Sequence, residues 1–529
     1  MLFASYEFIG FIMLVFLLYY VLPKKWQWKL LLTASYVFYF IADPVYLIYI
    51  LVTTVTVYFL GCKIEDFREE QGLYLKAHKE ELSKEDKKLY KAQIKKKQWQ
   101  VLLVALFINL GILAVVKYTN FAISNVNALM RAMDKPEFGF LDIALPMGIS
   151  FYTFQAVGYI IDVYRGTSAA ERNPFKFALF VSFFPQLVQG PISRYNDLAK
   201  TLYQEHCFDK KVFCYGLQRI GWGFFKKVVI ADHILVAVNT LIRDTDSYSG
   251  AYVFVGMMFY AVELYADFTG GIDITIGIAE TMGITVAENF NRPFFSKSIK
   301  EYWRRWHITM GTWFTDYIFY PISVCKPMLK LSKKSRTLLG ETIGKRVPIY
   351  LSSFAVWFAT GVWHGASWNF IVWGLANWVV IMVSQELEPL YKKFHAVFPW
   401  GNSFLYKLFQ VVRTILLMSC LRTFDCYRDV PLTFRMLGTM FTAKNWNVLW
   451  DGSLMNIGLN AVDYVILVCG VVLLIVVSLI QRKGKVRDQV AGLAYPLRFV
   501  IWYGLFLTIL LMGAYGVGYD ASQFIYNQF

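Results

Sequence analysis

Long uninterrupted apolar runs are the feature that most limits the folds open to this chain. Typical runs are about 17–25 residues long, the length that a helix needs to cross a hydrocarbon core of roughly 30 Å. Apolar residues make up 57% of the 529 positions and charged residues 17%. A soluble chain of this length would need more polar residues to cover its surface. The sequence therefore predicts an all-α fold, a polytopic bundle of transmembrane helices forming a single domain over residues 1–529.

The runs predict about 10–13 spans or partial spans. The strong runs are 6–22, 45–61, 100–116, 251–266, 347–363, 404–421, 464–480 and 495–515, and less uniform runs lie at 29–41, 143–163, 175–189, 224–241 and 370–384.

Charges between the runs predict the orientation. Lys24, Lys25 and Lys29 follow the first run, and residues 62–98 form a polar insert rich in lysine. Two spans separate these segments, so both lie on one side, and the positive-inside rule makes that side cytoplasmic and the N-terminus external. The first run lacks a preceding basic region, as expected of a retained span. The insert is expected to be a solvated helical hairpin, with a docking site for a cytosolic partner as the alternative.

Composition also excludes several classes of function. The net charge of +16 reflects topology and affinity for anionic lipid headgroups, and nucleic acid is not an expected partner. The seven cysteines show no metal-type pairing, so no metal site is expected. The sequence has no phosphate-binding loop, dinucleotide fingerprint or G-x-S-x-G nucleophile elbow.

Three stretches place polar residues in apolar surroundings, where an ionisable group is costly and indicates function. In the first, residues 182–194, Pro185, Gly190 and Pro191 cannot all lie in an undisturbed helix. Two interpretations remain open here. The stretch is either a helix end at the membrane interface or a re-entrant segment that lines a cavity.

The second stretch, residues 301–322, is rich in tryptophan and tyrosine. A continuous helix would set Trp303 above His307 and Glu301 above Arg305. Two interpretations remain open: a functional cluster of polar residues, or an interfacial helix with an aromatic belt and snorkelling arginines. The ionisable residues of interest are Arg304, Arg305, His307 and Asp316.

The third stretch, residues 354–373, contains His364 between Gly361 and Gly365. The two glycines thin the wall around the imidazole and allow close backbone approach. A structural histidine is the alternative reading. An imidazole in a confined, partly apolar site suits general base catalysis near neutral pH, and it could take a proton from a hydroxyl that attacks an acyl carbonyl.

At these same stretches the sequence resembles the membrane-bound O-acyltransferase family, in particular the branch of alginate and peptidoglycan O-acetylation. The similar segments are M-L-F-A-S-Y-E-F and Y-V-L-P-K-K-W near the start, L-P-M-G-I-S-F-Y-T-F-Q-A-V-G-Y-I-I-D-V-Y-R-G at 145–166, F-F-P-Q-L-V-Q-G-P-I-S-R, Y-W-R-R-W-H-I-T-M-G-T-W-F, G-V-W-H-G-A-S-W-N-F and the closing F-I-Y-N-Q-F.

The resemblance implies helices around a central tunnel, with His364 as the essential histidine and His307 as the second characteristic one. It implies an O-acyltransferase of the bacterial cytoplasmic membrane that uses acetyl-CoA as a donor substrate, with no bound cofactor. The acetyl group would pass to an extracytoplasmic SGNH-type partner and then to a glycan acceptor. Other residues expected along the donor or substrate tunnel are Arg304, Arg305, Trp306, Trp313, Asp316, Trp363, Asn369, Gln155, Gln186 and Asp267.

Two segments depart from the family pattern. The chain has D-F-T-G-G-I-D at 267–273 in place of D-F-S-G-Y-S-D, and D-Y-I-F-Y-P-I-S-V at 316–324 in place of a Y-I-P-L-G-G-like turn. Acceptor or partner choice could therefore differ from that of alginate acetylation. Two rival functions are a D-alanyl transferase of the teichoic-acid type, which uses a carrier-protein thioester, and a transporter or flippase with a histidine proton relay.

Overall fold

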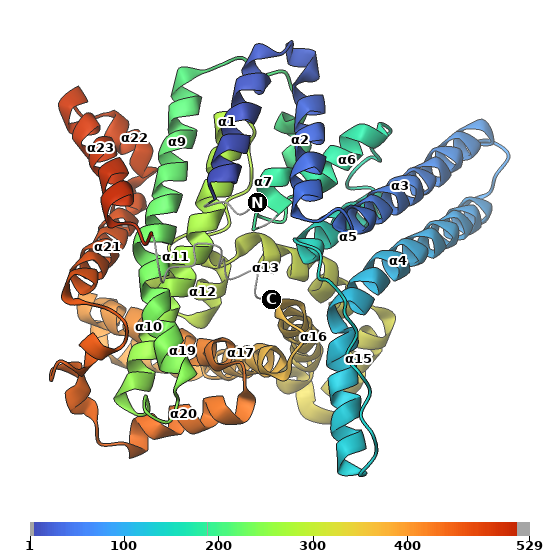
Figure 1. Ribbon diagram of the computed structural model, residues 1–529. Coiled ribbons are helices and arrows are strands. Elements are labelled where there is room, and N and C mark those ends of the chain that lie inside the picture. The colour runs from blue at the N-terminus through green and yellow to red at the C-terminus, as the bar shows by residue number, and fades with distance from the viewer. Residues whose placement is uncertain (1–4, 188, 516–529) are drawn as a thin grey trace. The chain divides into compact units, whose positions relative to one another are not determined.

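The fold is entirely helical in the part of the chain that the structure, a computed structural model, describes (Figure 1). It describes residues 5–187 and 189–515, so the first four residues of the similar N-terminal segment and the closing F-I-Y-N-Q-F lie outside the described residues. The chain divides into two compact units. Unit 1 comprises Met1–Phe213 and Ile278–Ala287, and unit 2 comprises Cys214–Gly277 and Glu288–Phe529.

Unit 1 contains five helices of 16 or more residues and several short ones in its described part. They are α1 (Tyr6–Val21), η1 (Lys24–Trp26), α2 (Gln27–Ala42), α3 (Tyr46–Ala77), α4 (Lys84–Ala132), α5 (Ile149–Arg165), α6 (Pro174–Ser182), α7 (Phe184–Leu187) and α8 (Tyr195–Leu202).

Unit 2 contains most of α9 and of α11, the elements between them and all elements that follow α11. They are α9 (Lys210–Phe224), η2 (Phe225–Ala231), α10 (Asp232–Arg243), α11 (Ala251–Thr281), η3 (Pro293–Phe295), α12 (Ile299–Arg305), α13 (Ile308–Phe314), η4 (Thr315–Phe319), α14 (Tyr320–Ser323), α15 (Lys326–Gly344), α16 (Val347–His364), α17 (Trp368–Glu386), α18 (Glu388–Val397), η5 (Pro399–Asn402), α19 (Phe404–Tyr427), α20 (Val430–Thr442), η6 (Trp446–Leu449), η7 (Ser453–Asn456), α21 (Ala461–Ile480), η8 (Gln481–Lys483), α22 (Val486–Ala491) and α23 (Tyr495–Met512).

Seven helices of the described residues are long and apolar enough to cross a membrane, which confirms the predicted polytopic all-α fold. They are α3, α4, α11, α17, α19, α21 with η8, and α23, and α1 is apolar but shorter. These helices are fewer than the roughly 10–13 spans or partial spans that the sequence predicts, because some apolar runs form short or broken helices. Run 175–189 divides into α6 and α7, and run 224–241 divides between η2 and α10.

The polar insert forms the tip of a helical hairpin, as the sequence predicts. α3 continues beyond its apolar part to Ala77, and α4 begins at Lys84, where Ser83 and Asp86 form a capping box. Figure 1 shows α3 and α4 running side by side through this segment. Docking of a cytosolic partner stays a prediction.

Two consecutive lysines are buried in unit 2 on a π-helical segment, η2. Lys226 Nζ lies 2.6 Å from Asp273, which Arg219 also contacts at 2.9 Å. Lys227 Nζ lies 2.7 Å from Asp267 and 2.8 Å from Asp232. A π-helix has a wider turn than an α-helix, and this altered register lets neighbouring lysines reach different aspartates.

Close glycine contacts join α9 to α11 beside these ion pairs. A Cβ on Gly270 would lie 2.9 Å from the carbonyl oxygen of Gly223, and one on Gly277 would lie 2.8 Å from that of Gly216. Small residues let two helix backbones approach closely in a membrane protein. The D-F-T-G-G-I-D segment thus provides an interhelical contact surface at Gly270 and two paired aspartates.

We expect Lys227→Met to destabilise the protein more than Lys226→Met. Lys227→Met leaves Asp267 and Asp232 buried without this cation, and breaking a buried pair costs about 3–5 kcal/mol. After Lys226→Met, Asp273 keeps Arg219. Thermal unfolding in one neutral detergent measures the difference. Equal losses in melting temperature, or a larger loss for Lys226→Met, would contradict the pairing.

Candidate active site

His307 lies in a sharp break between two short helices of unit 2. α12 ends at Arg305 and α13 begins at Ile308, while His307 has a left-handed backbone with φ of 46°. This conformation costs on the order of 1–3 kcal/mol for a residue with a Cβ, so the surroundings must impose it. The prediction of one helix with Trp303 above His307 is wrong, because the helix ends first. The predicted pairing of Glu301 with Arg305 is present at 2.5 Å.

Asn289 holds this break in place. Its backbone carbonyl accepts a hydrogen bond from the N–H of Ile308 at 2.9 Å. Its Oδ1 accepts from the backbone N–H of Thr309 at 3.0 Å and lies 3.3 Å from Nδ1 of His307. The backbone N–H of Thr309 can only donate, so the side-chain atom of Asn289 that faces it is the amide oxygen and not the nitrogen. The same oxygen faces Nδ1 of His307, so the imidazole proton belongs on Nδ1. Nε2 is then the basic nitrogen of His307.

The environment of His307 keeps its imidazole neutral. The side chain is fully buried and packs at ring-centroid distances of 4.9 Å from Phe268 and 5.9 Å from Trp363. Burial, together with the positive charge of Arg422, lowers the pKa of His307 below its usual value, since both disfavour the protonated form. His307 is therefore neutral at neutral pH and can accept a hydrogen bond at Nε2.

His364 is the last residue of α16 and is 7% exposed. Its ring lies 4.7 Å from that of Trp373 on α17, in an edge-to-face arrangement. A Cβ on Gly361 would lie 2.6 Å from the carbonyl oxygen of Phe370, and one on Gly365 would lie 2.2 Å from the Phe370 ring. The two glycines therefore allow the close backbone approach that the sequence predicts, here between α16 and α17.

Trp363 brings the two histidine segments together. Its indole ring is 5.9 Å from the His307 ring and 5.1 Å from the His364 ring, edge-to-face in both cases. The 301–322 and 354–373 stretches, which are separate in the sequence, thus meet at one aromatic side chain. Their roles in catalysis stay a prediction.

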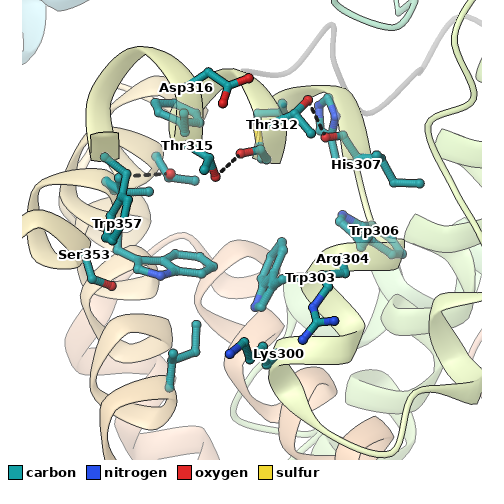
Figure 2. Close-up of a pocket in the computed structure, with 18 of the residues that line it drawn as sticks. Lys300, Trp303, Arg304, Trp306, His307, Thr312, Thr315, Asp316, Ser353 and Trp357 are labelled. Carbon is teal, nitrogen blue, oxygen red and sulfur yellow. Dashed lines mark hydrogen bonds between the residues drawn. The ribbon is translucent and has the colours of Figure 1, made fainter. Parts of the chain in front are cut away.

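A cavity of about 480 Å³ opens beside His307. Figure 2 shows Lys300 and Arg304 on one side of it and Asp316 on the other, with Trp303 and Trp306 between the basic residues and His307. Of the predicted tunnel residues, Arg304, Trp306 and Asp316 line this cavity, as does His307. His364 is not among its lining residues.

Other predicted tunnel residues of unit 2 make internal contacts. Arg305 pairs with Glu301, and Trp313 is buried against Tyr317 at 5.1 Å. Asn369 accepts a hydrogen bond from the Ser367 hydroxyl and donates one to the carbonyl of Phe424 at 3.1 Å, which ties α17 to α19. Asp267 pairs with Lys227 in the buried cluster.

The two predicted glutamines belong to unit 1. Gln155 Nε2 donates to the carbonyl of Phe180 at 2.7 Å. Gln186 Nε2 donates to the carbonyl of Pro191 at 3.0 Å and to the hydroxyl of Ser193. Helix α6 ends at Ser182, and the broken backbone that follows is largely buried. Protein therefore surrounds this stretch. Its two interpretations, a helix end at the membrane interface and a re-entrant segment that lines a cavity, stay predictions.

Arg422 is a residue of this site that sequence reasoning missed. It lies on α19, is 5% exposed, and its guanidinium lies 5.6, 5.1 and 4.8 Å from the rings of Trp303, Trp306 and Trp373. Each distance is within the range of a cation–π contact. The signal was an arginine with Asp425 three residues later at the end of an apolar run, since an ionisable pair at membrane depth indicates a functional site.

Comparison with known proteins now identifies the family. The model of the membrane-bound O-acyltransferase family matches residues 169–426, which include both histidines and Arg422. The chain is 32% identical over 452 residues to "Probable alginate O-acetylase AlgI" of Pseudomonas syringae pv. tomato, covering 85% of this chain and 76% of the relative. The chain belongs to the membrane-bound O-acyltransferase family. It is a multi-pass membrane O-acyltransferase.

More distant relatives of this O-acyltransferase differ in their named reactions. The "Peptidoglycan O-acetyltransferase" of Helicobacter pylori is 30% identical over 330 residues, covering 58% of each chain. The "Teichoic acid D-alanyltransferase" of Bacillus subtilis is 29% identical over 257 residues, covering 47% of this chain and 61% of the relative.

We expect changes at Asn289 to act through His307. Asn289→Leu removes the acceptor at Nδ1, so the acyl-transfer rate should fall by about tenfold or more, as when the hydrogen-bond partner that orients a functional imidazole is lost. Asn289→Asp keeps an acceptor but adds a negative charge, which raises the pKa of His307. Protonation then begins at higher pH, so the acid limb of the pH–rate profile should move to higher pH.

Rates measured from pH 3 to 9 with purified variants, a range that includes the low pH at which His307 protonates, test this expectation. Asn291→Leu, two positions along the same loop, serves as the control. An unchanged acid limb in Asn289→Asp, with a normal rate in Asn289→Leu, would contradict a role for His307 in transfer.

Proposed function

We propose that this O-acyltransferase takes an acetyl group from acetyl-CoA at the cytoplasmic face and passes it across the membrane for O-acetylation of an extracellular glycan. An extracytoplasmic SGNH-type protein would receive the acetyl group and esterify the polysaccharide or cell-wall glycan. The names of the relatives, which include O-acetylation of alginate and of peptidoglycan, support an acetyl group and a glycan acceptor. The expected orientation has the N-terminus outside.

One observation carries the proposal: the cavity beside His307 combines a basic side with aromatic walls. Lys300 and Arg304 line it together with Trp303 and Trp306. Guanidinium and ammonium groups suit the phosphates of a nucleotide-linked thioester, and the indole rings suit its less polar acyl arm. Arg305 is not used for the donor in this proposal, because its guanidinium pairs with Glu301.

The proposed chemistry is general base catalysis by His364. The imidazole takes the proton of the attacking hydroxyl while the hydroxyl oxygen bonds to the thioester carbonyl carbon. The carbon–sulfur bond then breaks, and the imidazolium returns its proton to the leaving thiolate, so the products are an ester and a thiol. His307, neutral and fixed by Asn289, is the positioning residue for donor or acceptor. Trp363, in contact with both rings, couples their placement.

We expect His364→Ala to reduce acetyl transfer by about a hundredfold or more, the lower range for loss of a general base. The assay follows labelled acetyl from acetyl-CoA to the partner protein, with the purified chain in liposomes. His395→Ala is the matched control, because His395 is exposed on α18 and should leave the rate unchanged. Wild-type transfer by His364→Ala would contradict the mechanism.

A D-alanyl transferase is the second candidate, since the Bacillus subtilis relative is named for that reaction. The two candidates differ in donor. Acetyl-CoA and a D-alanyl carrier-protein thioester, offered separately to the same preparation, distinguish them. Transfer from the carrier protein alone would replace the acetyl proposal with the aminoacyl one.

A further inference from the structure

We propose that a second, basic cavity, at the foot of the α3–α4 hairpin in unit 1, binds the phosphate headgroup of an anionic phospholipid. The cavity has a volume of about 390 Å³. It is separate in sequence from the histidine site and has no part in the proposed transfer reaction. Its lining residues are Arg68, Gln71, Lys91, Ala92, Lys95, Gln98, Tyr164 and Arg165.

The lining carries four positive side chains from three helices and no carboxylate. Glu65 offsets part of this charge, because it contacts Arg68 Nη1 at 2.7 Å. Lys95 Nζ donates to the carbonyl oxygen of Tyr164 at 2.8 Å and lies 3.6 Å from the centre of its ring. The cavity therefore keeps an excess of positive charge, which favours an anion.

Hydrogen bonds within the protein hold two of the lining side chains in place. Arg68 Nη2 donates to the carbonyl oxygen of Val163 at the end of α5. Gln98 donates to the carbonyl oxygen of Ile64 at 3.1 Å and is buried, which fixes α4 against α3. A site with side chains already held in place loses less entropy on binding.

The cavity lies at the level expected for lipid headgroups. Arg68 follows the end of the apolar run 45–61 by about 10 Å of helix, and Lys95 precedes the run 100–116 by about 8 Å. Headgroups extend several ångströms beyond the hydrocarbon core, and long basic side chains reach further. Tyr164, which lines the cavity, lies 5.8 Å from Trp99, and such aromatic residues are typical of a membrane interface.

The face of α4 beyond the cavity favours a phospholipid over a soluble phosphate. Lys91, Lys95, Trp99 and Leu103 follow one another at intervals of four residues, so they share one face of the helix. Trp99 is 45% exposed and Leu103 44% exposed. A basic end continues into an aromatic and then an aliphatic surface, which matches the order of phosphate, glycerol and acyl chain in a phospholipid. Basic pockets between membrane helices bind such headgroups.

Native mass spectrometry of the full chain in neutral detergent tests the site. The titrant is phosphatidylglycerol, with phosphatidylcholine of the same acyl chains as the neutral comparison. The test variant is Lys91→Gln/Lys95→Gln/Arg165→Gln. The control, Lys84→Gln/Lys87→Gln/Lys88→Gln, removes the same charge from the tip of the hairpin.

We expect the test variant to bind phosphatidylglycerol about tenfold or more weakly and phosphatidylcholine as before, while the control binds both like the wild type. Lys91→Glu alone, which alters none of the hydrogen bonds above, should weaken phosphatidylglycerol binding in the same direction even if the triple variant fails to fold. Equal losses in the test and control variants would overturn the proposal. Displacement of the lipid by millimolar inorganic phosphate would overturn it in favour of a free-phosphate site.

Discussion

A backbone N–H or C=O group that is buried in a protein needs a hydrogen-bond partner there, because burial removes the water that would otherwise supply one. The break at His307 meets this demand through Asn289, whose backbone and side-chain oxygens accept from the N–H groups of Ile308 and Thr309. The same side-chain oxygen faces Nδ1 of His307. One buried amide therefore both permits the helix break and selects the tautomer of the histidine. The geometry of the cavity beside it depends on this contact.

The buried cations of unit 2 also have partners within the protein. Lys226 and Lys227 meet aspartates of α11, and Arg422 lies over three tryptophan rings next to the histidine site. A guanidinium tolerates an aromatic face better than an ammonium does, because it is planar and less strongly hydrated. The Arg422 charge also disfavours protonation of His307. The aromatic wall thus accommodates a permanent cation that keeps its neighbour neutral.

Periodicity and composition were sufficient for the features that involve one segment at a time. The apolar runs predicted the helical membrane fold, lysine and glutamate marked the hairpin tip, and Gly361 and Gly365 predicted close approach at His364. They could not show that Trp363 contacts both histidines, because that contact joins segments more than fifty residues apart.

Contacts that arise only on folding were missed for the same reason. Nothing in the sequence around Asn289 announces its bond to His307, and the wider turn of η2 has no periodic signature. The continuous helix expected through Trp303 and His307 failed because spacing alone does not reveal a left-handed residue. The ion pair of Asp267 with Lys227 was likewise not predicted, and the assignment of Asp267 to the tunnel stays a prediction.

The central claim is that the two histidine segments form one site around Trp363, served by the tryptophan-lined cavity. A cryo-electron microscopy map of the full chain in lipid nanodiscs, with an unreactive thioether analogue of acetyl-CoA, tests it most directly. We expect density for the acyl arm beside Trp306 and His307 and for the phosphates near Lys300 and Arg304, with Trp363 still against both imidazoles. An analogue bound elsewhere, or His307 and His364 on separate sides of an open gap, would contradict it.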